Sequence, residues 1–302
     1  MNILVVGSVA YDTVKTPFGQ AEDVLGGSAS YFSVAASFFT SVRLVAAVGE
    51  DFRAEDRAVL ERRKIDLSGL CTEKGKTFRW SGKYGYNLNE AHTLVTALNV
   101  FEHFQPRLPD SYRDSELVFL ANIDPDLQRQ VLEQVKDPKL VALDTMNFWI
   151  DSKLDSLRRT LSKINLLMIN DGEARQLSGE VNLVRAAQKI FEWGPSTLVV
   201  KRGEYGVLMF TREATFAAPA YPLESVLDPT GAGDSFAGGF MGYLANSGNF
   251  GEPSIRQAII MGSVMASFNV EAFSLDRLSK LSYREIEDRY RAMKRLTHFE
   301  DL

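Results

Sequence analysis

Short apolar runs separated by helical stretches constrain the fold of this chain more than any other feature. The first run, residues 3–6, ends at Gly7-Ser8 and reads as a strand buried on both faces. Similar runs recur at residues 42–48, 117–121, 140–143, 166–169 and 198–200. Helical patterns lie between most of them, at residues 28–39, 53–64, 126–135, 155–161 and 183–191. This alternation predicts an α/β fold with a central, mostly parallel sheet that has helices on both faces.

One region breaks the alternation. Residues 72–104 are rich in aromatic side chains and predict β-hairpin strands with a turn near Ser81-Gly82. Together with residues 11–24 they predict a small sheet that projects from the main domain. Aromatic pairs across strands would also stabilise a plain surface hairpin, so this reading stays open. Because no linker rich in Pro, Gly or Ser divides the chain, we expect a single domain over residues 1–302.

Composition excludes several classes of protein. The chain has 302 residues, 45% of them hydrophobic and 24% charged, as is usual for a soluble globular protein. A formal charge of -5 argues against a nucleic-acid partner, because proteins dedicated to binding nucleic acid usually have a basic face. Cys71 is the only cysteine, which excludes an intrachain disulfide and a thiolate zinc cluster. The sequence shows no charged-then-apolar leader and no long apolar run, so we expect a cytoplasmic protein with no membrane partner.

The stretch DPTGAGDSFAGGF, residues 228–240, carries the clearest chemical signal. It predicts a loop that turns into a helix, with Thr230 as the cap. Three residues with little or no side chain expose their backbone N–H groups at the helix start, where an anion is favoured: Gly231, Ala232 and Gly233. Asp234 follows them as a carboxylate that can accept a proton. An anion site beside a base suits phosphoryl transfer to a hydroxyl.

The helix predicted after this loop argues against the simpler interpretation, a tight turn followed by close helix packing. It contains three interior glycines, each costing about 1 kcal/mol relative to alanine: Gly238, Gly239 and Gly242. We therefore expect the backbone of this helix to lie close to a sheet or a nucleotide.

The stretch resembles the C-terminal signature of the ribokinase-like (PfkB) family of carbohydrate and nucleoside kinases. The resemblance implies that Asp234 is the catalytic base and that three backbone amides form an anion hole: Gly231, Ala232 and Gly233. Pro229 departs from the threonine usual in the family. Proline removes one N–H and stiffens the loop, but it leaves the Gly-Ala-Gly-Asp core unchanged.

A second stretch, residues 26–51, resembles the other signature of the family, and the resemblance spans nearly the whole chain. Gly26 and Gly27 open a small-residue helix whose first N–H groups can meet a substrate hydroxyl. Tyr31 stands where many members have an asparagine that binds substrate. A phenol can still donate a hydrogen bond, but it fills more space and offers an aromatic face. Together with the aromatic side chains of residues 72–104, Tyr31 leans slightly toward a nucleoside rather than a sugar as the acceptor.

The resemblance implies further contacts on the acceptor side. It assigns Asp12 to gripping substrate hydroxyls, with an ordinary turn aspartate as the alternative. It places another polar contact at Asn122 and Asp124, after the strand 117–121. The segments at residues 11–24 and 72–104 then correspond to the family's lid, whose purpose is to exclude water during transfer. Exposed lid edges sometimes pair between subunits, which allows a homodimer through the lid.

The nucleotide side is implied in the same way. Asn170 and Glu173 form a capping box, which needs no function, or organise Mg²⁺ and its waters near the phosphates. Lys201, Gly203 and Gly206 match a nucleotide-side loop, in which Lys201 reaches phosphate or solvent. The remaining residues implied are Asn269, toward adenine or ribose, and Asp228 with the Thr230 carbonyl, as a K⁺ site.

The sequence therefore predicts an ATP- and Mg²⁺-dependent kinase that phosphorylates a hydroxymethyl oxygen of a sugar or nucleoside, with K⁺ as a further candidate cofactor. A non-catalytic ligand sensor on a kinase scaffold is the main alternative, and the presence of both Asp234 and Glu173 argues against it. A dinucleotide-dependent oxidoreductase is a weaker one, because Gly7 follows the first strand without a G-x-G-x-x-G fingerprint.

Overall fold

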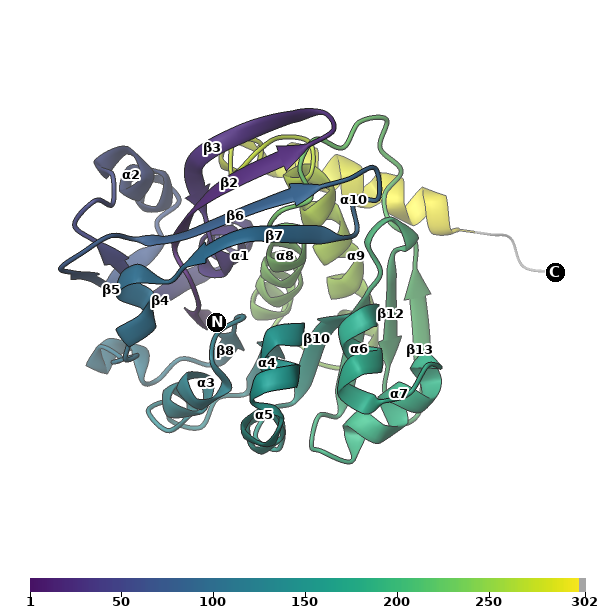
Figure 1. Ribbon diagram of the computed structural model, residues 1–302. Coiled ribbons are helices and arrows are strands. Elements are labelled where there is room, and N and C mark those ends of the chain that lie inside the picture. The colour runs from purple at the N-terminus through teal and green to yellow at the C-terminus, as the bar shows by residue number, and fades with distance from the viewer. Residues whose placement is uncertain (299–302) are drawn as a thin grey trace.

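A nine-stranded sheet runs through the middle of the computed structural model, which describes residues 1–298 (Figure 1). Its strands lie in the order β13 (Thr215–Ala218), β12 (Val207–Phe210), β11 (Thr197–Lys201), β10 (Leu166–Asn170), β9 (Leu140–Asp144), β8 (Leu117–Leu120), β1 (Asn2–Val6), β4 (Ser41–Gly49) and β5 (Asp66–Glu73). All pairs from β11 to β5 are parallel, and β12 and β13 add an antiparallel edge. The carboxyl ends of the parallel strands therefore meet at one edge, where α/β folds bind ligands.

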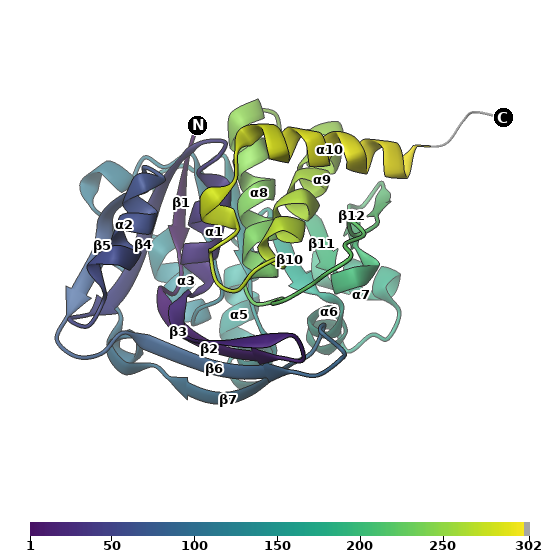
Figure 2. The same cartoon turned by 90° about the horizontal axis from the view of Figure 1, so that it is seen from above.

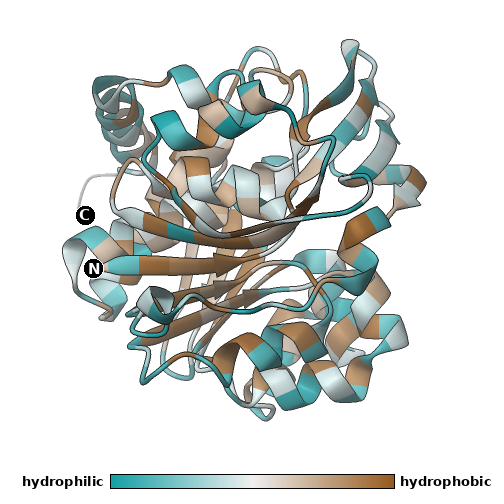
Figure 3. Ribbon diagram, turned by 90° about the vertical axis from the view of Figure 1, so that its left-hand side faces the viewer, coloured by the Kyte–Doolittle hydropathy of each residue, from teal (hydrophilic) through white to brown (hydrophobic). Residues whose placement is uncertain are grey.

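Helices cover both faces of this main sheet, as predicted. Successive strand residues point to opposite faces, so Ile3 joins one apolar core and Leu4 the other. The first core includes residues of α1 (Ser28–Ala36), α2 (Ala54–Arg62), α8 (Ala232–Ser247), α9 (Glu252–Asn269) and α10 (Tyr283–Thr297). The second includes residues of α3 (Pro125–Leu132), α4 (Asn147–Ser152), α5 (Leu154–Leu161), α6 (Asp171–Ser178) and α7 (Leu183–Phe191). Figure 3 shows the apolar strands between the two helical layers.

Four strands form a second, smaller sheet beside the carboxyl end of β1 (Figure 2). Their order is β3 (Gly19–Gly26), β2 (Ala10–Thr16), β6 (Phe78–Tyr84) and β7 (Ala91–Ala97). The predicted turn near Ser81-Gly82 is wrong, because β6 continues through both residues and the chain turns only after Tyr84. Residues 72 and 73 also differ from the prediction, since they belong to β5 at the edge of the main sheet.

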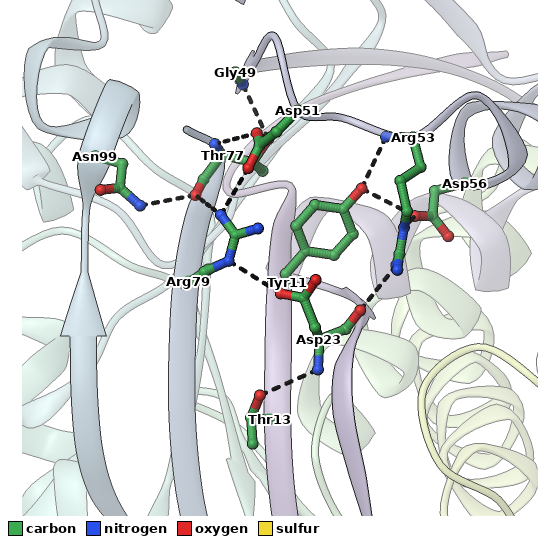
Figure 4. A network of polar contacts seen from close by, with 10 residues as sticks. All are labelled: Tyr11, Thr13, Asp23, Gly49, Asp51, Arg53, Asp56, Thr77, Arg79 and Asn99. Carbon is green, nitrogen blue, oxygen red and sulfur yellow. Dashed lines mark hydrogen bonds and ion pairs between the residues drawn. The ribbon is translucent and has the colours of Figure 1, made fainter. Parts of the chain in front are cut away.

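One face of the smaller sheet is tied to the loop after β4 by the polar network in Figure 4. Arg79 of β6 donates to Asp51 Oδ2 at 2.8 Å and to Asp23 Oδ1 at 3.0 Å. Its guanidinium lies 5.2 Å from the ring centroid of Tyr11, the residue paired with it on β2. Tyr11 in turn donates to Asp56 Oδ2 at 3.0 Å. Because strand residues alternate, the neighbouring pair Asp12 and Trp80 faces the opposite way.

The glycines of α8 are explained by helix packing and not by a nucleotide or a sheet. A Cβ on Gly238 would clash with the Phe32 carbonyl oxygen of α1, and one on Gly239 would clash with the Met265 side chain of α9. At Gly242 the nearest atom is Cδ2 of Phe39, at 2.7 Å. The missing side chains let α8 approach its neighbouring helices closely, so these glycines carry no information about a ligand.

We expect Gly238→Ala to destabilise the protein. Alanine favours a helix interior over glycine by about 1 kcal/mol, but here its methyl group meets a backbone carbonyl that cannot rotate away. Overpacking of this kind costs about 1–3 kcal/mol, so the free energy of unfolding in urea should fall. Gly85→Ala is the matched control, because a Cβ there meets no atom within 4 Å. A more stable Gly238→Ala protein would contradict this account of the α1–α8 contact.

Within residues 1–298, none of the helices combines the length and the apolar character needed to cross a bilayer.

Candidate active site

The start of α8 forms the centre of the site. Gly231 is the N-cap residue and adopts left-handed geometry, with φ 76°, which favours glycine. A Cβ at this position would also clash with the Tyr31 ring. The helix N-terminus places backbone N–H groups and a partial positive charge at Gly231, Ala232 and Gly233. The Ala232 N–H donates to the Pro229 carbonyl at 3.1 Å, so one of the three amides is engaged in the turn itself.

The predicted cap at Thr230 is wrong. Gly231 is the N-cap and no side chain caps the helix, because left-handed geometry at Gly231 turns the chain directly into α8 at Ala232. Thr230 instead donates from its hydroxyl to Tyr84 OH of β6 at 3.2 Å. This bond joins the smaller sheet to the loop that precedes α8.

Asp234 lies in the first turn of α8, beside these amides. The pKa of its carboxyl is raised to about 7, mainly by burial and also by the negative charge of Asp144, while Lys201 opposes the shift. A carboxylate with a pKa near 7 accepts a proton more readily than an ordinary aspartate at neutral pH. Asp234 therefore has the electrostatic environment of a general base.

A buried ammonium lies next to the amides. Lys201 ends β11, and its Nζ donates to Asp144 Oδ2 at the end of β9 at 2.8 Å. The same Nζ lies 3.1 Å from the position that a Cβ on Gly233 would occupy. The Lys201 side chain is only 17% exposed, so it does not extend into solvent. Its positive charge therefore adds to that of the helix start.

Glu173 lies on the same side of the site, in the first turn of α6. It forms a complete capping box with Asn170: the Glu173 N–H donates to Asn170 Oδ1 and the Asn170 N–H to Glu173 Oε2, both at 2.8 Å. The pKa of Glu173 is raised to about 7, mainly by burial and also by the charge of Asp144, while Lys201 opposes the shift. The capping box is thus present, and the predicted magnesium role stays a prediction.

Asp12 lies on the other side of the site. Its carboxylate occupies the space that a Cβ on Gly26 would take, and it accepts from the Gly27 N–H at the start of α1. The pKa of Asp12 is raised to about 7, mainly by burial and also by the charges of Asp228 and Asp234. The structure therefore brings Asp12 and Asp234 into one electrostatic environment, although they are far apart in the chain.

Two tyrosine side chains, Tyr31 and Tyr84, lie near these carboxylates. Tyr31 of α1 is buried, and its hydroxyl has no hydrogen-bond partner within the described residues. Burial raises its pKa well above the ordinary value, with smaller contributions from Asp12, Asp228 and Asp234. Burial likewise raises the pKa of Tyr84 to about 12. Both hydroxyls stay protonated at neutral pH and can donate to a ligand.

Two of the predicted acceptor contacts already have partners in the protein. Asn122 Oδ1 accepts from the Trp149 indole N–H at 3.1 Å. Asp124 caps α3 and pairs with Lys153 Nζ at 2.6 Å. These contacts give both residues structural roles, and a contact to substrate stays a prediction.

Asn269 and Asp228 hold the loop before α8. Asn269 ends α9 and is 1% exposed; its Nδ2 donates to the Thr230 carbonyl at 2.7 Å, and its Oδ1 accepts from Ser235 Oγ at 3.0 Å. Asp228 Oδ1 accepts from the Thr230 N–H at 2.9 Å, whereas its buried Oδ2 has no partner within residues 1–298. The amide of Asn269 thus fixes the loop from inside the protein.

Gly203 and Gly206 lie where β11 turns into β12, and the two strands form an antiparallel hairpin. Both glycines have positive φ, 53° and 85°. The connection between β6 and β7 touches this hairpin, because Asn89 Nδ2 donates to Glu204 Oε1 at 3.2 Å. The smaller sheet therefore contacts both Thr230 and the β11–β12 turn, a pairing of distant segments that the sequence did not reveal.

A model of the pfkB family of carbohydrate kinases matches residues 2–279. The chain belongs to this family. The cytidine kinase of Thermococcus kodakarensis is 30% identical over 249 residues, which cover 80% of this chain and 87% of that protein. As a pfkB family member, the protein is a phosphotransferase with an alcohol group as acceptor, as predicted.

Solved structures of kinases share the fold. The Burkholderia thailandensis nucleoside kinase in complex with inosine has a TM-score of 0.81 and 19% identity, with 96% of this chain and 98% of that chain covered. A putative ribokinase II from E. coli in complex with ATP and Mg²⁺ has a TM-score of 0.78 and 17% identity, with 96% and 99% covered. These likenesses confirm the predicted pfkB-type fold.

Proposed function

We propose that this pfkB kinase transfers the γ-phosphoryl group of ATP to a hydroxymethyl oxygen of a sugar or nucleoside. The observation that carries the proposal is the position of Asp234. A carboxyl with a pKa of about 7 lies in the first turn of a helix whose N-terminal amides and neighbouring ammonium favour an anion. Base and anion site are thus adjacent, as an in-line transfer from phosphate to alcohol requires.

In this mechanism each residue has a separate task. Asp12 and the Tyr31 hydroxyl hold the acceptor, and Asp234 takes the proton of the attacking hydroxyl as the new O–P bond forms. The charge that develops on the transferred group is stabilised by the N–H groups at the start of α8 and by Lys201. Electrostatic stabilisation is usually the largest contribution in phosphoryl transfer, so the helix start and Lys201 matter as much as the base.

The described residues are compatible with a magnesium ion that is held by few protein side chains and mostly by water. No cluster of three or more His, Cys, Asp or Glu side chains able to hold a metal occurs in residues 1–298. Mg²⁺ keeps most of its water and needs only one or two carboxylates. Glu173 would supply one, and Asn170 lies beside it. When bound, the ion would neutralise phosphate charge.

Of the two K⁺ ligands predicted before α8, only the Asp228 carboxylate has an oxygen available. The buried Asp228 Oδ2 is an oxygen without a hydrogen-bond partner among the described residues, as a cation ligand would be. The Thr230 carbonyl, in contrast, already accepts from Asn269. Asp228 would therefore hold K⁺ mainly through its carboxylate.

The names of relatives support the acceptor class. The Thermococcus kodakarensis relative is a cytidine kinase, and a Methanothermobacter thermautotrophicus relative, 24% identical over 291 residues, is a nucleoside kinase. The smaller sheet would serve as the lid over the acceptor, since Tyr84 reaches the loop before α8.

The proposal is tested by measuring ADP release from ATP and Mg²⁺ with a panel of sugars and nucleosides, against a reaction without acceptor. We expect at least one acceptor to raise ADP release at least about tenfold over the acceptor-free rate, with a phosphorylated hydroxymethyl group in the product. Tight binding of a panel member with no ADP release would instead favour the ligand-sensor alternative.

A further inference from the structure

One aromatic ring of the smaller sheet faces the site without being used by it. Trp80 pairs with Asp12 in the parallel β2–β6 ladder, so the two side chains extend from the same face. Tyr84, four residues further along β6, extends from that face as well, and its hydroxyl bonds to Thr230. Trp80 therefore lies on the site-facing side of the smaller sheet, on the same face as Asp12 and Tyr84.

The indole of Trp80 lies against its own strand. A Cβ on Gly82 would clash with Cη2 and Cζ2 of the indole, so the benzene ring covers this glycine directly. The indole N–H donates to Thr93 Oγ1 of β7 at 3.2 Å, and Thr93 is the partner of Gly82 in the β6–β7 ladder. Glycine below and a hydrogen bond at the edge hold the ring in this position.

One face of this ring lies against Gly82. Trp80 is partly exposed, and among residues 1–298 no aromatic ring or guanidinium group stacks on it. By contrast, the aromatic residues of the same region near η1 (Asn99–His103) stack on one another, as Phe78 does on Phe101 at 5.7 Å. The Trp80 ring is thus held by Gly82 and Thr93, and its flat surface has no stacking partner among the described residues.

We propose that Trp80 is a stacking platform for a nucleobase, and that the acceptor of this kinase is a nucleoside. The inference rests on the proposed function, and it names the substrate class of the same site. Asp12 and Trp80 are partners on neighbouring strands, so their backbones lie roughly 5 Å apart across the ladder. A ribose held by Asp12 therefore brings the group at its anomeric carbon next to the indole, and a planar base fills that position.

Chemistry distinguishes a base from a free sugar here. A nucleobase offers two flat faces and stacks on an aromatic ring whatever its hydrogen-bonding pattern. A free sugar is anchored by its hydroxyls and places no planar group on the ring. The platform therefore predicts tolerance among bases and dependence on the presence of a base.

The decisive experiment compares Trp80→Ala with the wild-type enzyme on two kinds of acceptor: the four common ribonucleosides and free ribose. Stacking of one base is typically worth a 5- to 100-fold change in binding, so kcat/KM for the best nucleoside should fall roughly 5- to 100-fold, mostly through KM. Any activity with ribose should change less than about twofold. Trp80→Phe should recover part of the loss, because it restores an aromatic face.

Gly82→Ala provides a second variant that keeps the tryptophan. Its φ is not in the left-handed region, so alanine fits the backbone, but its methyl group displaces the indole. We expect the same loss for nucleosides as with Trp80→Ala. Gly85→Ala, at a position with open space, should leave the kinetics unchanged.

Binding is read separately from turnover by fluorescence. In a Trp149→Phe/Trp193→Phe background, Trp80 is the only tryptophan, since the chain has three. We expect ribonucleosides to quench its emission with saturation and ribose to have no effect. Nucleoside turnover that is insensitive to Trp80→Ala and Gly82→Ala, or turnover of free sugars only, would overturn the platform. Saturable quenching without any ADP release would refute the proposed kinase activity and leave the platform supported.

Discussion

Asp234→Asn is expected to lower kcat by at least about 10²-fold while ATP still binds. General-base catalysis typically contributes roughly 10²–10⁴-fold, and asparagine keeps the shape of the side chain without accepting a proton. Steady-state kinetics with the best acceptor, and calorimetric titration of ATP, measure the two quantities. The pH profile gives an independent test: wild-type kcat should fall as pH drops below about 7, where the Asp234 carboxylate becomes protonated.

Asp155→Asn is the matched control for this substitution. Asp155 also lies in the first turn of a helix, α5, but its side chain is exposed. It should keep wild-type kinetics. Turnover of Asp234→Asn within a few-fold of wild type would remove Asp234 from its role as base and leave the anion site to be explained in another way.

Lys201→Met is expected to have the second-largest effect. Removing one preorganised donor to a developing negative charge costs about 10²–10³-fold in kcat, and Lys201 supplies such a donor beside Gly233. The ammonium also lowers the pKa of Asp234, so its loss should move the acidic limb of the pH profile to higher pH. Rates measured between pH 5 and 9 give both effects.

A double variant separates catalysis from stability. Lys201→Met leaves the Asp144 carboxylate buried without its ammonium, which destabilises the protein. Lys201→Met/Asp144→Asn removes that charge and, with it, the contribution of Asp144 that raises the pKa of Asp234. We expect the double variant to recover stability and a near-normal acidic limb, but not kcat.

A surface pair controls for the loss of a lysine. Lys139 pairs with Glu116 at 2.8 Å, with its side chain 52% exposed, so Lys139→Met should alter neither rate nor pH profile. If Lys201→Met/Asp144→Asn regained wild-type kcat, Lys201 would serve only to neutralise Asp144.

The sequence was most informative where function depends on local backbone. The loop-to-helix junction at Gly231 was predicted because glycine geometry and a following carboxylate are local features. Prediction failed where a residue's role depends on a distant partner. Gly82 read as a turn, since nothing nearby in the sequence shows that an indole covers it. The α8 glycines predicted a close sheet or nucleotide, because nothing nearby in the sequence shows that their partners lie on or just after α1 and on α9.

Lys201 illustrates the same limit for charge. Its neighbours Asp144 and Glu173 follow different strands, and only the parallel order of β9, β10 and β11 brings all three together. A lysine after a buried strand therefore has an undetermined role until the strand order is known. Polar residues recur at or just after the ends of these parallel strands, and such ends meet at one edge of an α/β sheet.

The alternation along β2 and β6 has a consequence for how this protein tolerates change in length. Tyr11 and Arg79 anchor one face of the smaller sheet, while Asp12 and Trp80 extend from the other. Inserting or deleting a single residue within either strand would exchange the two faces, so that anchor and site fail together. Such changes can be absorbed instead in the connection around Gly85, which has free space beside it.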